Sequence, residues 1–403
     1  MIRVIDSIMG SGKTNWAIKF MNENPDKKFV YITPYTEEID DRMLKVCKGF
    51  QQPEHILVNG KKERKLTDLH RLLREGSNIC STHALFKLTT EETIQLLQQH
   101  NYILIMDEVF DVIEQLSLKK DDLKDIFERK HAHVDELTGY LVWDNPSYNG
   151  RYNDVMKLAL NKNVFVIDNT ALVWLFPAQI FKYFSDTYIL TYMFNCQVQR
   201  YYFDLNKVDY QYFKVHLGDN GYFIKEHDFM PDDTSKFKIN IHTGKMNDIG
   251  KDFNSLCVEW YKKNRSKLPE LKKHLNNFFR NICKSPSGFN LWTTFEEYKK
   301  YLQGKGYTEG FLACNARAVN KYRDKVNVAY TVNRFMNVAV YKFFTKIHKM
   351  KIGKEEQRRY GLAEMLQFIY RSGLRDGKPI NLYVPSERMR HSLQEWLGVS
   401  KAD

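Results

Sequence analysis

Short apolar runs, separated by stretches with helical spacing, recur through the first half of the chain. They lie at residues 2–5, 29–32, 78–80, 102–106, 164–168 and 187–192. The run at 102–106 is continuous and has polar residues on both sides. Both faces of such a strand must be covered, which is typical of a parallel sheet between two layers of helices. The alternation of strands and helices predicts a doubly wound α/β domain over residues 1–195.

Aromatic residues and lysines dominate the next part of the chain. Tyrosine and phenylalanine crowd residues 201–203, 210–213 and 222–223, and a Gly-Asp-Asn-Gly turn lies at 218–221. This pattern predicts strands and hairpins, followed by basic helices over 254–283. The aromatic side chains either form a compact core or stack on unpaired bases. Residues 196–285 are therefore predicted to be a β-rich and basic helical connecting region.

A second parallel-sheet domain is predicted for residues 286–403. Its strands are expected at 290–294, 311–314, 326–335 and 380–385. Between the last two, apolar residues at helical spacing predict a helix over 362–376, with a break at Gly373 as the alternative. Gln367, Arg371 and Arg375 follow each other at intervals of four along another stripe of it. Guanidinium groups at that spacing can contact one anion together, whereas a solvated basic stripe is the alternative.

Length and charge narrow the class of protein. The 403 residues indicate two or three domains, and 61 Lys and Arg against 49 Asp and Glu give a net charge of +12. That surplus favours a polyanionic partner such as DNA or RNA, although a merely basic protein would also have it. Six scattered cysteines without a CxxC pair indicate reduced thiols and no zinc site. Neither a signal peptide nor a membrane-spanning apolar run is visible, so we expect a cytoplasmic protein with no membrane partner.

A glycine-rich turn at residues 7–14 directly follows the first predicted strand. Its residues Met9, Gly10, Ser11, Gly12, Lys13 and Thr14 lead into a predicted helix. Strand, glycine-rich turn and helix are the context of a phosphate-binding loop, whose backbone N–H groups and helix N-terminus face one anion. We expect Lys13 to reach the β and γ phosphates of ATP and Thr14 to bind Mg²⁺. Ser7 replaces the usual first glycine, and a turn without ligand is the alternative.

Two carboxylates, Asp107 and Glu108, end the continuous strand at 102–106. The carboxyl edge of an open α/β sheet is where ligands bind. Together with the loop, Asp107 is predicted to bind Mg²⁺ through its water shell, and Glu108 to polarise the water that attacks the γ phosphate. Without the loop, the pair would be read as a solvated strand end.

These residues resemble motifs of superfamily 2 helicases. Residues 10–14, 107–108 and 169–171 look like motifs I, II and III. Residues 9–14 and 106–109 are particularly similar to herpesvirus-type origin-binding helicases and to small phage helicases. The resemblance implies a fold of two RecA-like parallel-sheet domains, with ATP in the cleft between them and a nucleic-acid strand across their top.

The resemblance also suggests roles for residues outside the ATP motifs. Thr33 and Thr82 lie where motifs Ia and Ib are expected, whose counterparts contact the phosphodiester backbone. Arg317 and Asn320 belong to a stretch that looks like motif V. Residues 367–375 resemble motif VI, whose arginines enter the ATP cleft from the second domain. One of these arginines would serve as the arginine finger, the residue that stabilises the transferring phosphate. Because that motif more often spaces its arginines by three residues, the choice between Arg371 and Arg375 stays open.

The sequence therefore predicts an ATP-dependent DNA helicase or translocase of phage-type replication or recombination. Its expected partner is single-stranded or forked DNA, with RNA as an alternative strand and replication proteins as further partners. Two rivals remain: an ATPase of the same fold that moves without separating strands, and a DNA-binding recruitment factor gated by ATP. A nucleotide kinase would leave the second half of the chain unexplained.

Overall fold

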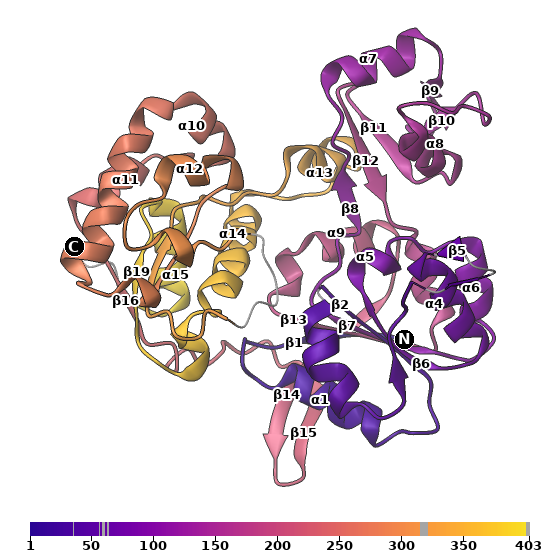
Figure 1. Cartoon of the computed structure of the whole chain (residues 1–403), viewed down its shortest axis with the longest axis horizontal. Helices are drawn as coiled ribbons and strands as arrows, with labels where there is room; N and C mark the ends of the chain where they lie inside the picture. Colours follow the sequence, from indigo (N-terminus) through magenta and orange to yellow (C-terminus); the bar gives the residue numbers. More distant parts are fainter. Residues whose placement is uncertain (35, 56, 59–60, 63, 315–320, 400–403) are drawn as a thin grey trace. The chain divides into compact units, whose positions relative to one another are not determined.

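The chain folds into two units of α and β structure. The computed structural model describes residues 1–34, 36–55, 57–58, 61–62, 64–314 and 321–399 (Figure 1). The first unit comprises Met1–Ser7, Gly12–His227 and Met336–Gly353, and the second comprises Ile8–Ser11, Asp228–Phe335 and Lys354–Asp403. Within the described residues, none of the helices combines the length and the hydrophobicity that crossing a bilayer requires.

An eight-stranded sheet forms the centre of the first unit. Its order is β15-β14-β1-β13-β7-β2-β6-β3, and every pair is parallel except β14 with β15. This arrangement confirms the predicted doubly wound sheet, and the strand at 187–192 lies in its middle. The strands are β1 (Ile2–Asp6), β2 (Phe29–Thr33), β3 (Phe50–Gln51), β6 (Asn78–Thr82), β7 (Ile103–Asp107), β13 (Asp186–Thr191), β14 (Tyr210–Gly218) and β15 (Gly221–Glu226).

Helix α1 (Lys13–Asn22) covers one face of this sheet. Its Trp16, Ala17 and Met21 are buried against Tyr31 of β2 and Ile105 of β7. Burying each large apolar side chain stabilises the fold by roughly 1.5–3 kcal/mol. The helix that follows the glycine-rich turn is thereby fixed to the sheet through its apolar side.

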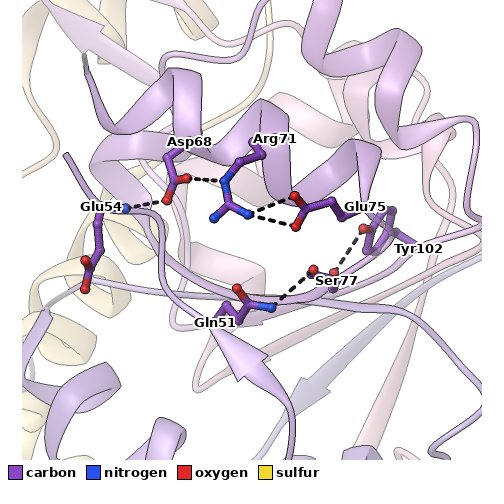
Figure 2. Close-up of polar contacts among 7 residues, drawn as sticks. All are labelled: Gln51, Glu54, Asp68, Arg71, Glu75, Ser77 and Tyr102. Carbon is purple, nitrogen blue, oxygen red and sulfur yellow. Dashed lines mark hydrogen bonds and ion pairs between the residues drawn. The ribbon is translucent and has the colours of Figure 1, made fainter. Parts of the chain in front are cut away.

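A polar network closes the β3 edge of the sheet (Figure 2). Asp68 of α4 (Lys65–Arg74) is only 2% exposed, and its carboxylate accepts hydrogen bonds from Arg71 Nε at 2.8 Å and Glu54 N at 2.9 Å. Arg71 also donates to both carboxylate oxygens of Glu75. The buried carboxylate ties the loop after β3 to α4, which protects an edge that would otherwise be open.

A subdomain of residues 113–175, here called the inserted subdomain, lies in the chain between β7 and β13. It has its own core and consists of β8 (Ile113–Gln115), α7 (Lys120–Glu128), β9 (Ala132–Val134), β10 (Leu141–Trp143), α8 (Asn153–Leu160), β11 (Val164–Ile167) and β12 (Ala171–Leu175). The placement of 164–168 in the main sheet was wrong, because β11 pairs antiparallel with β12. In the turn between β11 and β12, Asp168 and Asn169 each adopt a left-handed backbone conformation, as a tight hairpin requires.

The aromatic region after β13 is partly helical. Residues 201–203, predicted as a strand, lie in α9 (Val198–Leu205), where all three aromatic side chains are buried. Tertiary packing here overrides the β preference of aromatic residues. The hairpin of β14 and β15 is confirmed, and it extends the main sheet beside β1.

The second unit contains a four-stranded parallel sheet in the order β16-β19-β18-β17. The strands are β16 (Ile239–Ile241), β17 (Asn290–Thr293), β18 (Asn327–Tyr330) and β19 (Ile380–Tyr383). β17, β18 and β19 were predicted. β16 was not predicted, because the strand at 290–294, now β17, was expected to be the first of this sheet. The predicted strand at 311–314 is reduced to a single bridge between Phe311 and Trp292.

Helices cover both faces of this second sheet. Trp292 and Tyr383 pack against α10 (Val258–Lys263) and α11 (Leu268–Asn277), beside α12 (Lys299–Leu302). Val328 and Tyr330 lie on the other face of the sheet, opposite to Trp292 and Tyr383. There, Tyr330 packs against Phe368 of α14 (Lys354–Ile369), and α14 contacts α15 (Glu387–Trp396). The second unit is therefore an α/β sandwich, as the sequence predicted.

We expect Asp68→Ala to lower the free energy of unfolding by about 1–3 kcal/mol, because the backbone N–H of Glu54 and the guanidinium of Arg71 lose a buried acceptor. Urea denaturation measures this. Glu75→Ala removes the exposed end of the same network and should change the value by less than about 0.5 kcal/mol. Equal effects of the two substitutions would contradict a structural role for the buried carboxylate.

Candidate functional site

The turn between β1 and α1 has the backbone of a phosphate-binding loop. Gly10 and Gly12 adopt φ angles of 76° and 97°, and Gly12 directly precedes the first residue of α1. A Cβ atom on Gly12 would lie 2.0 Å from the Cε1 atom of Tyr222 on β15. Glycine is therefore required at position 12 by the backbone angle and by the neighbouring ring.

Ser7, which replaces the usual first glycine, is fixed by the main sheet. It is only 1% exposed, and its hydroxyl oxygen accepts a hydrogen bond from Val215 N of β14 at 2.9 Å. Its own N–H donates to Thr191 O of β13 at 3.0 Å. Lys13 Nζ donates to Ser7 O at 2.6 Å. The serine thus joins the loop to the two strands that flank β1 and holds the ammonium group over the loop.

Asp6, the last residue of β1, anchors the start of the loop to the main sheet. Its carboxylate accepts hydrogen bonds from Met193 N at 2.7 Å and Phe194 N at 2.9 Å, just beyond β13. Burial raises the pKa of Asp6, while these two N–H donors act in the opposite direction. The last residue of β1 is thereby tied to the segment that follows its neighbouring strand.

Asp107 and the end of β1, from which the loop departs, lie at the same level of the same sheet edge. Asp107 pairs with Leu190 of β13, and Leu190 pairs in turn with Ile5 of β1. Because strands are about 4.8 Å apart, β7 and β1 are separated by roughly 10 Å. The parallel register therefore brings the two predicted halves of a nucleotide site together.

A buried tyrosine orients Asp107. Tyr31 OH donates to Asp107 Oδ2 at 2.7 Å. Burial, with the negative charge of Asp107 as a second cause, raises the pKa of Tyr31 well above its usual value, so the phenol stays protonated and keeps donating. Glu108 follows with φ at 72°, and its N–H donates to Leu190 O at 2.9 Å. The chain turns sharply at the proposed catalytic carboxylate.

Thr33 and Thr82 end adjacent strands at this same edge. They pair with each other across β2 and β6. Thr82 Oγ1 accepts a hydrogen bond from Leu85 N and so caps α5 (His83–Phe86). Thr33 is 1% exposed, and within the described part of the chain its buried hydroxyl has no hydrogen-bond partner. Arg317 and Asn320, predicted as strand contacts, lie outside the described residues.

The three predicted motif VI residues do not share one helix. α14 ends at Ile369, so Gln367 lies in its last turn while Arg371 and Arg375 lie beyond it. Ser372 Oγ donates to Ile369 O at 2.6 Å and accepts from Leu374 N at 3.3 Å. These local bonds end the helix and start a short 3₁₀ turn, Gly373–Asp376. The predicted stripe was wrong: Arg371 is buried and Arg375 is exposed.

Several contributors to the site were missed at the sequence level. Asp6, Tyr31 and Tyr222 carry no motif, and only the place of Asp6 at the end of the first strand could have indicated a role. The turn at 169–171, predicted as motif III, belongs to the hairpin of β11 and β12 in the inserted subdomain. It therefore lies on a different sheet from Asp107.

Gly12→Ala should lower the free energy of unfolding more than Gly49→Ala does. Both glycines have positive φ angles, so an alanine at either position is strained by about 1–2 kcal/mol. Only at position 12 would the added Cβ also clash with a neighbour, because a Cβ on Gly49 would meet nothing within 4 Å. Adding Tyr222→Ala should recover the excess cost at position 12. Chemical denaturation of the single and double variants measures this, and equal costs at the two glycines would refute the steric argument.

Comparisons with known proteins agree with this architecture. A protein-family model described as the YonV C-terminal Rossmann-like domain matches residues 233–397, and one described as the YonV middle domain matches residues 113–174. The first match lies almost wholly in the second unit, and the second coincides with the inserted subdomain.

Two solved structures share the fold over nearly the whole chain. S. tokodaii Xpd4 has a TM-score of 0.53 at 11% identity and covers 99% of this chain and 94% of its own. A structure called XPD_APO has a TM-score of 0.50 at 11% identity, with coverage of 100% and 96%. This likeness to the two XPD structures confirms the predicted fold class of two parallel-sheet α/β domains. The particular likeness to herpesvirus and phage helicases stays a prediction.

A full-length relative identifies the family. The SPbeta prophage-derived uncharacterized protein YonV of Bacillus subtilis (strain 168) is 40% identical over 410 residues, and the match covers 98% of each chain. At this identity and coverage, the chain belongs to the YonV family.

Proposed function

We propose that this chain is an ATP-dependent helicase or translocase that acts on DNA, with Mg²⁺ as its metal cofactor. The observation that carries the proposal is the shared register of β1, β13 and β7, which aligns the end of β1, from which the glycine-rich loop departs, with Asp107 at one sheet edge. The fold shared with the two XPD structures supports it, together with the motifs that resemble those of superfamily 2 helicases. The prophage origin of the relative supports a role in phage replication or recombination in the host cytoplasm, with replication proteins as partners.

The loop residues would hold the phosphates. Backbone N–H groups of Met9, Gly10 and Gly12 would face the β and γ phosphates. The N–H of Ser11, which donates to Ile8 O at 3.2 Å, and the ammonium group of Lys13 would exchange the carbonyls of Ile8 and Ser7 for phosphate oxygens. This exchange is favourable because an ionised acceptor makes the stronger hydrogen bond with an ammonium group. The helix N-terminus at Lys13 adds to the attraction.

A hydroxyl and a carboxylate, from Thr14 and Asp107, would hold Mg²⁺, which supplies charge neutralisation at the transferring phosphate. Among the described residues, no group of three or more His, Cys, Asp or Glu side chains could hold a metal ion alone. This suits Mg²⁺, which takes one or two protein ligands and completes its shell with phosphate and water. Tyr31 would keep the Asp107 carboxylate oriented.

Glu108 would polarise the attacking water, and arginines of the second unit would stabilise the transferring phosphate. Because α14 ends at Ile369, Arg371 and Arg375 are carried by a turn that can adjust without bending a helix. Gln367, in the last helical turn, would position that segment. Thr33 and Thr82, with Arg317 and Asn320, would contact the strand backbone.

The primary test is ATP hydrolysis without nucleic acid and with single-stranded DNA, duplex DNA or RNA, followed by strand displacement on forked DNA. We expect stimulation by single-stranded DNA and displacement that depends on ATP. Stimulation without displacement would support a motor that does not unwind. Tight DNA binding with no stimulated hydrolysis would favour an ATP-gated recruitment factor.

Glu108→Gln should reduce ATP turnover by about 100-fold or more, because the neutral amide cannot activate water, while nucleotide affinity is retained. A coupled phosphate-release assay and a fluorescent-nucleotide titration measure the two effects. Asp111→Asn removes an exposed carboxylate three residues further along and serves as the control. Normal turnover in Glu108→Gln would exclude Glu108 as the base.

At least one of Arg371→Ala and Arg375→Ala should reduce turnover by about 1,000-fold, the usual effect of an arginine finger, while nucleotide affinity falls much less. Arg359→Ala, at an exposed position of α14, is the matched control. If both variants hydrolyse ATP as the control does, neither Arg371 nor Arg375 acts as an arginine finger.

A further inference from the structure

A segment from the second half of the chain completes the surface of the inserted subdomain. Residues Met336–Gly353 belong to the first unit, and Figure 1 shows their helix α13 (Val338–Lys342) beside β8 and β12. Phe343, which is 2% exposed, packs edge-to-face on Phe165 of β11 with ring centroids 5.3 Å apart. Asn337 Nδ2 donates to Gln115 Oε1 of β8 at 3.1 Å. We call this segment the basic strap.

The basic strap concentrates positive charge on this surface. Its residues 336–353 include Lys342, Lys346, Lys349 and Lys351, and no Asp or Glu. Asp168, at the β11–β12 turn, forms ion pairs with Lys342 Nζ at 3.1 Å and Lys346 Nζ at 2.7 Å. These two ammonium groups lower the pKa of Asp168. One carboxylate neutralises only part of the charge, so the exposed side of the basic strap remains cationic.

A hollow of about 480 Å³ lies beside the Asp168 turn. Phe127, Ala132 and Val134 form its apolar part, and its polar lining consists of Lys130, His133, Asp144 and Asn169. Asn169 follows Asp168 directly in the chain, so the hollow adjoins the residue that both lysines contact. His133 Nδ1 contacts Asp144 Oδ1 at 2.7 Å, which fixes the imidazole at the rim. The volume is within the range of sites for small aromatic ligands.

We propose that this surface binds single-stranded nucleic acid, with one unpaired base in the hollow and the flanking phosphates on Lys342 and Lys346. The inference rests on the proposed function, because it adds a strand site to a nucleic-acid motor. An aromatic and apolar wall suits the face of a base, and the amide of Asn169 suits its polar edge. The lysines suit the charge of the backbone. A base held in a duplex cannot enter, so the site selects single strands.

The test is fluorescence anisotropy with a labelled 20-nucleotide oligo(dT) and a duplex of equal length, without ATP and at several salt concentrations. Phe127→Ala should weaken binding of the single strand by about 5- to 100-fold, the usual effect of losing one stacked base. Lys346→Ala should reduce the slope of log affinity against log salt by about 0.7. Asn169→Gly removes the amide but keeps the left-handed backbone, and it should also weaken binding.

Lys157→Ala, at an exposed position of α8 in the same subdomain, is the matched control and should change affinity by less than about twofold. The melting temperature of each variant shows whether it is folded. If Phe127→Ala is unfolded, Asn169→Gly and Lys346→Ala still test the site, because both residues are exposed. The proposal is overturned if Asn169→Gly and Lys346→Ala bind like the control, or if duplex DNA binds as tightly and responds in the same way.

The two proposals can fail separately. Lys13→Ala should lose ATP turnover and keep the affinity for oligo(dT), because the basic strap binds the strand without nucleotide. If the wild-type chain binds single strands through these residues but hydrolyses no ATP, the motor function fails and the strand site stands. If strands stimulate hydrolysis and the surface variants behave normally, the motor stands and this site falls.

Discussion

The parallel pairing of β13 with both β1 and β7 is the constraint on which the candidate site depends. A parallel sheet places the carboxyl ends of its strands at one edge, and the register decides which residues lie level there. Here it aligns the end of β1, from which the glycine-rich loop departs, with Asp107 on β7. A shift of one residue between β13 and β7 would turn the Asp107 side chain to the opposite face of the sheet, and the same shift between β13 and β1 would do so for the side chains of β1.

Buried polar groups under the edge hold this alignment. Asp6 binds the segment after β13, Ser7 binds β13 and β14, and the phenol of Tyr31 binds Asp107. Each of these contacts removes freedom from a group that would meet phosphate or metal. The departure from the usual loop pattern at Ser7 has a physical reason, because the serine hydroxyl accepts the N–H of Val215 in the strand that extends the sheet beyond β1.

The sequence predicted the elements whose signal is local. A continuous apolar run ending in two acids indicated β7, and glycine spacing indicated the loop before α1, both of which the structure contains. The failures came from effects that no short pattern carries. The antiparallel return of β11 depends on two left-handed residues, the helix of residues 201–203 depends on burial on all sides, and the end of α14 depends on the hydroxyl of Ser372. Asp6 and Tyr31 were missed because their partners are distant in the chain.

The central claim is that this sheet edge binds a nucleotide together with Mg²⁺, and calorimetric titration of ATP tests it most directly. The account predicts that the wild-type chain binds ATP more tightly with Mg²⁺ than with excess chelator, and that Asp107→Ala removes this difference while the loop still binds the phosphates. Absent binding, or binding that ignores Mg²⁺ in the wild-type chain, would contradict it.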